Sequence, residues 1–166
     1  ITFQNGLVND ARFAPDGKTI VYQAIWPGSD PDIYVTQPGS PESRSLGLKD
    51  SRLAAISKSG ELLILRHVGG SRTLSQVPMG GGAPRDLLED VTWADWAPDG
   101  AAIAVVRGSG SRQHLEYPIG KTLCEGISMR HVRVSPNAKL VAFSDHPFAL
   151  DFRGDIAVVD ESGKKT

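Results

Sequence analysis

Three charged side chains stand at equivalent places in a repeated pattern of this sequence. Each lies three residues before the start of a tight turn, and they are Arg12, Asp95 and Arg133. Two residues earlier in the same strands come Asp10 and His131, which share their face because side chains two apart on a strand point the same way. Two arginine forks can hold a carboxylate or phosphate group through paired N–H donors. We therefore favour a structural ion-pair network between repeats for these residues, and the alternative is a site for a small anionic ligand held by the two arginines.

A second candidate site is a loop that interrupts the strand pattern. Trp26 lies in this loop together with Asp30, and Asp32 follows it. Aromatic side chains are favoured at protein interfaces. We therefore predict that these three residues contact a protein partner.

Signatures of catalysis are missing from the sequence. Gly120, Lys121 and Thr122 resemble the end of a phosphate-binding loop, but Leu115 stands where that loop needs glycine. There is no Gly-x-Ser-x-Gly elbow for a hydrolase nucleophile. The four histidines have no zinc spacing, and Cys124 is the sole cysteine. We expect a non-catalytic chain without cofactor or metal.

Charge and hydropathy exclude two further classes of partner. The formal net charge of −1 gives no strong attraction to nucleic acid or to an anionic membrane. The longest apolar run, residues 101–106, is far too short to cross a bilayer. We expect no nucleic-acid partner and no direct membrane contact.

The tight turns in the sequence predict the strands that position these residues. A Pro-Asp-Gly-type turn between two apolar strands occurs four times, and steps of 43, 40 and 38 residues separate its copies at Pro15, Lys58, Pro98 and Pro136. A period near 40 residues with several short strands per repeat is typical of β-propeller blades. In the strand after the first turn, alternation predicts Thr19 and Val21 outside and Ile20 and Tyr22 inside.

The predicted fold is therefore all-β, a propeller of four-stranded antiparallel blades in one domain over residues 1–166. The four repeats span 7–46, 52–88, 91–124 and 130–160, which is half a propeller or a fragment of one. First strands of blades line a central channel, where Arg12, Asp95 and Arg133 would gather. The aromatic residues at matching repeat positions are predicted to form the blade-to-blade core: Phe13, Tyr22, Trp93, Trp96 and Phe143.

The two ends of the chain are predicted to complement each other. Residues 1–3 form a strand without a neighbour, and the fourth repeat lacks its outer strand. We expect residues 1–3 to pair beside residues 155–159, since unpaired strand edges are liabilities. Within one chain this closes four blades. Between two chains it makes a homodimeric ring of eight blades, which we favour because closed symmetric assemblies are common.

The turn and third-strand residues resemble TolB-like, WD-repeat-related propeller repeats over essentially the whole chain. The best matches are Pro15 to Lys18, Pro98 to Gly100, Asp32 to Val35 and Asp155 to Val158. The segments 115–121, 133–136 and 145–147 also resemble the propeller that follows bacterial Ser/Thr protein kinases. The latter resemblance implies a sensor, binding or scaffold propeller on the extracytoplasmic (periplasmic) side of a bacterial signalling protein. The alternatives are the gating propeller of a prolyl-oligopeptidase-like peptidase and a TolB-like periplasmic adaptor.

Overall fold

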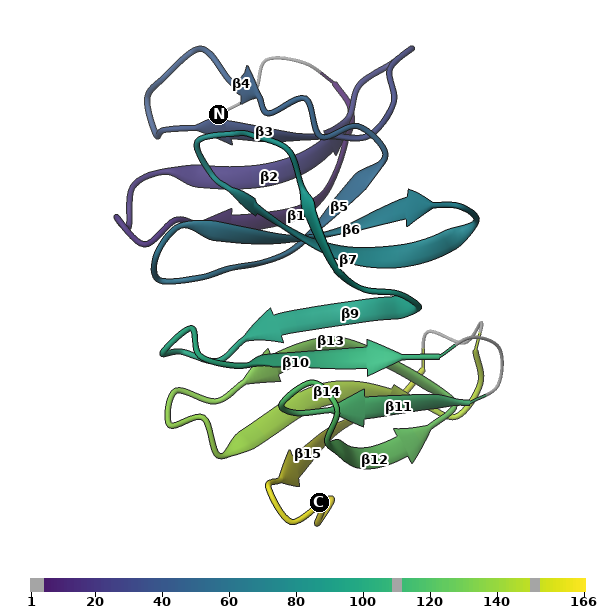
Figure 1. Cartoon of the computed structure of the whole chain (residues 1–166). Helices are drawn as coiled ribbons and strands as arrows, with labels where there is room; N and C mark the ends of the chain where they lie inside the picture. Colours follow the sequence, from purple (N-terminus) through teal and green to yellow (C-terminus); the bar gives the residue numbers. More distant parts are fainter. Residues whose placement is uncertain (1–4, 109–111, 150–152) are drawn as a thin grey trace. The chain divides into compact units, whose positions relative to one another are not determined.

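The chain folds into strands joined by tight turns, without a helix in its described part (Figure 1). A computed structural model describes residues 5–108, 112–149 and 153–166. The strands form antiparallel sheets in two compact units, residues 1–88 and residues 89–166. No helix long and apolar enough to cross a membrane occurs in these described ranges.

The first sheet of unit 1 begins with the turn motif of the sequence. Its strands lie in chain order: β1 (Leu7–Phe13), β2 (Ile20–Ile25), β3 (Asp32–Thr36) and β4 (Arg44–Ser45). Between β1 and β2, Gly17 has a φ of 68°, a conformation that glycine adopts without a Cβ clash. The Asp16 carboxylate accepts hydrogen bonds from the N–H groups of Lys18 and Thr19 at 2.9 and 2.8 Å. These bonds fix the turn and start β2.

The second sheet of unit 1 repeats this order and packs on the first. It contains β5 (Ser51–Ile56), β6 (Glu61–Val68), β7 (Ser71–Pro78) and β8 (Arg85–Leu88). β5 packs against β1, β2 and β3. The core between the sheets is formed by apolar side chains of both: Val21, Ile33, Leu48, Leu53, Leu62, Ile64 and Val77.

Unit 2 also holds two sheets. One contains β9 (Val91–Trp96), β10 (Ile103–Arg107), β11 (Gln113–Glu116) and β12 (Thr122–Gly126), and the other contains β13 (Ser128–Val134), β14 (Leu140–His146) and β15 (Asp155–Asp160). Leu115, Met129 and Phe143 are among the buried side chains that form its core. The residue ranges of the four predicted repeats agree approximately with those of the four sheets. The predicted all-β fold of antiparallel blades is confirmed.

The chain turns back along the outer edge of β15. The backbone of Val158 exchanges two hydrogen bonds of 2.8 Å with Thr166, and Val159 forms a bridge with Lys165. Residues 1–3, which were predicted to pair with residues 155–159, lie outside the described residues. Part of the edge assigned to them is occupied by residues 164–166.

Two parts of the predicted packing are wrong. Thr19 and Val21 were expected outside but are buried at 6% and 0% exposure, because side chains on both faces of β2 are buried. Phe13 was expected in the core but is 66% exposed, while Tyr22 and Phe143 are buried at 3% and 1%. The alternation pattern assumes one buried face per strand, and inner blade strands have two.

Candidate anion-binding pocket

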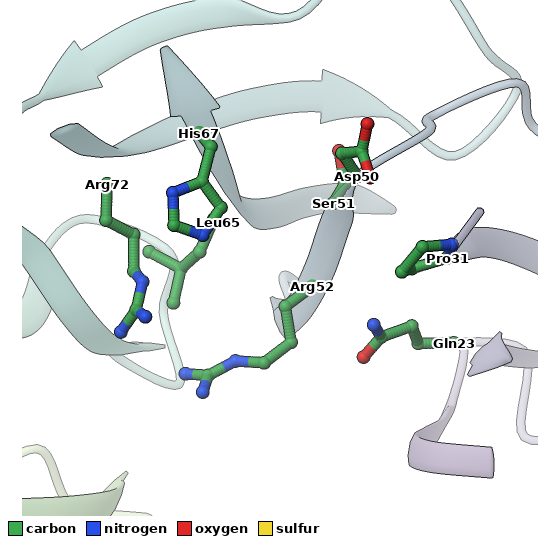
Figure 2. A pocket seen from close by; sticks show the side chains of 8 residues that line it. All are labelled: Gln23, Pro31, Asp50, Ser51, Arg52, Leu65, His67 and Arg72. Carbon is green, nitrogen blue, oxygen red and sulfur yellow. The ribbon is translucent and has the colours of Figure 1, made fainter. Parts of the chain in front are cut away.

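A pocket of about 380 Å³ opens in unit 1 at the ends of the strands (Figure 2). It lies at the end of the sheets opposite to the turns between first and second strands, where β2 and β6 end and β5 and β7 begin. Its lining residues come from both sheets: Gln23, Pro31, Asp50, Ser51, Arg52, Leu65, His67 and Arg72.

Strand register brings Arg52, His67 and Arg72 together. His67 lies directly opposite Arg72 across the β6–β7 hairpin, and Arg52 lies opposite Leu65 across β5–β6. The hairpin turns on Gly69 and Gly70, whose φ angles of 58° and 88° suit a two-residue turn of the type that matches strand twist. The short turn thus places His67 and Arg72 at the same rim of the pocket.

The two arginines interact electrostatically. Burial lowers the pKa of Arg52 to about 10, Asp10 acts in the opposite direction, and the charge of Arg72 lowers it further. Arg52 therefore remains cationic near pH 7, and both arginines line the same pocket (Figure 2). Arg72 and His67 are exposed, so an incoming ligand can reach them. An anion between the two arginines would relieve their mutual repulsion.

Gln23 contributes a neutral polar group from the neighbouring sheet. Its side chain points into the pocket beside Pro31 (Figure 2). The residue is only 5% exposed, and its Oε1 atom is buried without a hydrogen-bond partner in the described part of the chain. Buried amide oxygens are nearly always satisfied in folded proteins. The pocket therefore contains an acceptor that lacks a donor.

Two of the side chains predicted to bind an anion lie elsewhere in unit 1. Arg12 Nη2 is 3.7 Å from Asp10 Oδ1, and Arg12 Nη1 donates to the carbonyl of Ala11 at 2.8 Å. Both residues lie on β1, so this ion pair does not link two repeats. Asp10 nevertheless influences the pocket, since its charge acts on Arg52.

The remaining predicted residues lie in unit 2. Asp95 Oδ2 accepts a 2.9 Å hydrogen bond from the N–H of Val134, which ties β9 to β13. Arg133 Nη1 donates to the carbonyl of Val132 at 2.6 Å. His131 Nδ1 lies 2.9 Å from Ser144 Oγ. That Arg12, Asp95 and Arg133 gather around one channel stays a prediction.

The loop residues have mainly structural contacts. Trp26 is half-buried and packs edge-on against Tyr34 with ring centroids 5.7 Å apart. Asp32 is 6% exposed, and its carboxylate accepts hydrogen bonds from Ser45 Oγ at 2.5 Å and the N–H of Ile33 at 2.7 Å. Asp30 is exposed on the loop. A partner that reaches this loop would therefore contact Asp30 and the outer face of Trp26.

Metal-binding and nucleophilic groups are sparse. Within residues 5–108, 112–149 and 153–166, no three His, Cys, Asp or Glu side chains lie close enough together to hold a metal ion. Burial raises the pKa of the half-buried Cys124 thiol, with an opposing effect from Lys165. Raising the pKa of a thiol reduces its nucleophilicity near pH 7.

Comparison with known proteins identifies the architecture. No protein-family model matches the sequence, and no curated protein matches it either. Among solved structures, TolB from Acinetobacter baumannii superposes with a TM-score of 0.78 at 18% identity, over 96% of this chain and 43% of that one. The putative TolB from Agrobacterium tumefaciens gives 0.80 at 15% identity, over 96% and 64%. The fold is that of a TolB-like propeller.

The likeness extends to propellers of other proteins. The β-propeller domain of the Trilobed protease from Pyrococcus furiosus superposes with a TM-score of 0.59 at 11% identity, over 97% of this chain and 56% of that one. The chain thus spans less than two thirds of each of these structures. At such identities the likeness concerns the fold alone.

Proposed function

We propose that this chain is a non-catalytic binding module and that the pocket of unit 1 receives an anionic group. The observation that carries the proposal is the convergence of Arg52, Arg72 and His67 on one pocket of about 380 Å³. Guanidinium groups bind carboxylates and phosphates through paired, charge-assisted hydrogen bonds. A pocket of this volume lies in the lower range of small-molecule sites.

The chemistry of the lining residues favours holding a ligand over transforming it. Both arginines stay charged near pH 7, so they orient an anion without exchanging protons. Ser51 is buried at 1% exposure, and its hydroxyl donates to the backbone carbonyl of Lys49 at 3.2 Å. A nucleophile would need an adjacent base that takes up its proton. The pocket therefore suits a binding or sensing role.

The narrower version of this proposal is a sensor or scaffold domain of a bacterial signalling protein on the periplasmic side of the membrane. Its support is the sequence resemblance to kinase-associated propellers, together with a fold shared with TolB structures. A homodimer with eight blades belongs to the same proposal. Light scattering tests it, because the dimer has twice the 17.8 kDa mass of the chain.

A second candidate is the gating propeller of a peptidase. The structural likeness to the propeller domain of the Trilobed protease favours it. In that case a hydrolase domain would accompany this chain in the full-length protein, and the anionic pocket ligand would be an acidic substrate group. A TolB-like adaptor, in contrast, would use the pocket for a protein partner.

The binding proposal is tested by NMR titration with acetate, phosphate and sulfate. We expect shifts of backbone signals confined to residues 50–52, 65–67 and 72. Arg72→Gln should weaken binding at least about tenfold, since a hydrogen bond to a charged group contributes about 1.5–3 kcal/mol. Arg85→Gln is the matched control, because Arg85 is also exposed in unit 1 but lies outside the pocket. Equal weakening by both variants, or shifts spread over the surface, would contradict a specific site.

A further inference from the structure

The unpaired acceptor on Gln23 restricts which anion completes the pocket. Gln23 Oε1 is buried and requires an N–H or O–H donor. Acetate, sulfate and fully ionised phosphate offer only acceptor oxygens. They can satisfy Arg52 and Arg72 but leave Gln23 unsatisfied. A ligand that binds Arg52, Arg72 and Gln23 together must carry a donor as well as an anionic group.

The donor and the anion belong at different ends of the ligand. Figure 2 shows the side chains of Gln23 and Pro31 at one end of the pocket and the guanidinium groups of Arg52 and Arg72 towards the other. A ligand for this pocket therefore needs an anionic group on the side of the arginines and an N–H or O–H donor on the side of Gln23. An α-carboxylate and an acylated α-amino group meet this requirement, because they leave one Cα in directions about 111° apart and present an anion and an N–H donor to different walls of the pocket.

Apolar side chains form the remaining wall of the pocket. Leu65 is buried at 3% exposure, and together with Pro31 it provides apolar wall beside the polar groups. Such a surface accommodates a small apolar side chain on the same Cα. The volume of about 380 Å³ leaves room for one residue and its acyl group, which fits the lower range of ligand pockets.

We infer that the pocket of unit 1 recognises an α-carboxylate joined to an acylated amino group, with Arg52 and Arg72 binding the carboxylate and Gln23 accepting a hydrogen bond from the amide N–H. The inference rests on the proposed anion-binding function and adds the ligand class. This chemistry occurs at the C-terminal residue of a peptide and in free N-acylated amino acids. Gln23 then determines specificity, because it distinguishes these ligands from simple anions.

The test compares four small probes on the intact chain by NMR titration or calorimetry. N-acetylalanine carries both groups, propionate carries the carboxylate alone, N-acetylalanine amide lacks the carboxylate, and N-acetyl-N-methylalanine lacks the N–H. We expect N-acetylalanine to bind at least about fivefold more tightly than propionate, as one added hydrogen bond of about 1 kcal/mol requires. N-methylation should remove this gain, and loss of the carboxylate should abolish binding.

Gln23→Met provides the matched variant, because methionine has a similar length but no amide. It should bind N-acetylalanine only as tightly as propionate, while its affinity for propionate stays that of the wild type. If Gln23→Met does not fold, the comparison between N-acetylalanine and its N-methyl form on the wild-type chain decides the question. Trialanine distinguishes the sources: affinity equal to that of N-acetylalanine indicates a peptide C-terminus, and much weaker binding indicates a small acylated amino acid.

The two proposals fail in different ways. If propionate binds and N-acetylalanine binds no more tightly, the ligand class is wrong and the anion site stands. If neither probe nor any simple anion binds, the anion-binding function is wrong as well. If N-acetylalanine amide binds as tightly as N-acetylalanine, the arginines do not read a carboxylate, and the inference is overturned.

Discussion

Replacing Glu116 by Gln should destabilise unit 2 in a pH-dependent way. Glu116 is only 4% exposed, and its carboxylate has three donors. Oε1 is 3.3 Å from Arg107 Nη1 and 3.0 Å from His114 Nε2, and Oε2 accepts the N–H of Gly120 at 2.7 Å. Donors thus approach both oxygens, which only the ionised carboxylate can accommodate.

A glutamine amide at position 116 can accept hydrogen bonds on one side only. If its oxygen replaces Oε1, its NH₂ group faces the N–H of Gly120, and if its oxygen replaces Oε2, the NH₂ group faces the Arg107 cation. Each orientation loses a charge-assisted hydrogen bond and places the amide NH₂ group against another donor. The expected loss in the free energy of unfolding is about 1.5–3 kcal/mol at pH 7. The 30% exposure of the Arg107 side chain keeps the loss below the range of fully buried pairs.

The pH dependence of this loss follows from the pKa of Glu116. Burial opposes ionisation, but the N–H of Gly120, the charge of Arg107 and the hydrogen bond with His114 hold the pKa below its ordinary value of 4.5. A depressed folded-state pKa stabilises the fold above the unfolded-state pKa, and this stabilisation disappears as pH falls through the folded-state value. The difference between wild type and Glu116→Gln should therefore shrink between pH 7 and pH 3.

The assay is urea unfolding at both pH values, followed by the fluorescence of Trp93 and Trp96, which lie in the same unit. Glu125→Gln is the control, because Glu125 forms a 3.6 Å pair with Arg112 but its side chain is 59% exposed. Such surface pairs contribute about 0–1 kcal/mol. A Glu116→Gln effect no larger than that of the control, or one that is equal at pH 7 and pH 3, would refute the reasoning.

Two further substitutions test the packing of unit 1. Leu63→Asp should unfold the unit, since Leu63 is 0% exposed and an unpaired buried charge costs several kcal/mol; wild-type circular dichroism and melting would contradict its burial on β6. Gly6→Ala should displace Trp26, because a Cβ at position 6 overlaps the indole ring and the carbonyl of Ile25; an unchanged tryptophan emission maximum would contradict this contact.

The fold could be predicted from the sequence because its turns are local. Pro15, Asp16 and Gly17 determine a turn without help from distant residues, and the strands on both sides follow from it. Burial was harder to predict, as Val21 shows, since alternation does not reveal a second covering layer. β4 extends only over Arg44–Ser45 and is shorter than the outer strands β8 and β12.

The pocket of unit 1 is lined by none of the residues that were predicted to bind an anion. A search for matching repeat positions finds Arg12 and Arg133, whereas Arg52 and Arg72 occupy unlike positions of a single repeat. A signal for part of the pocket was present: a two-residue Gly69-Gly70 turn makes His67 and Arg72 direct partners. The position of Gln23 could not be predicted in this way, because it depends on how β2 packs beside β5.

Every sheet in the described part of the chain is built from strands that follow one another in sequence. The loops that must close during folding are therefore short, and their entropic cost is small. Such a low contact order favours fast folding, one hairpin at a time. It also means that no sheet of the described residues contains strands from both sides of the segment between Leu88 and Val91. A chain in which residues 89–166 came before residues 1–88 would therefore keep all the strands of each sheet.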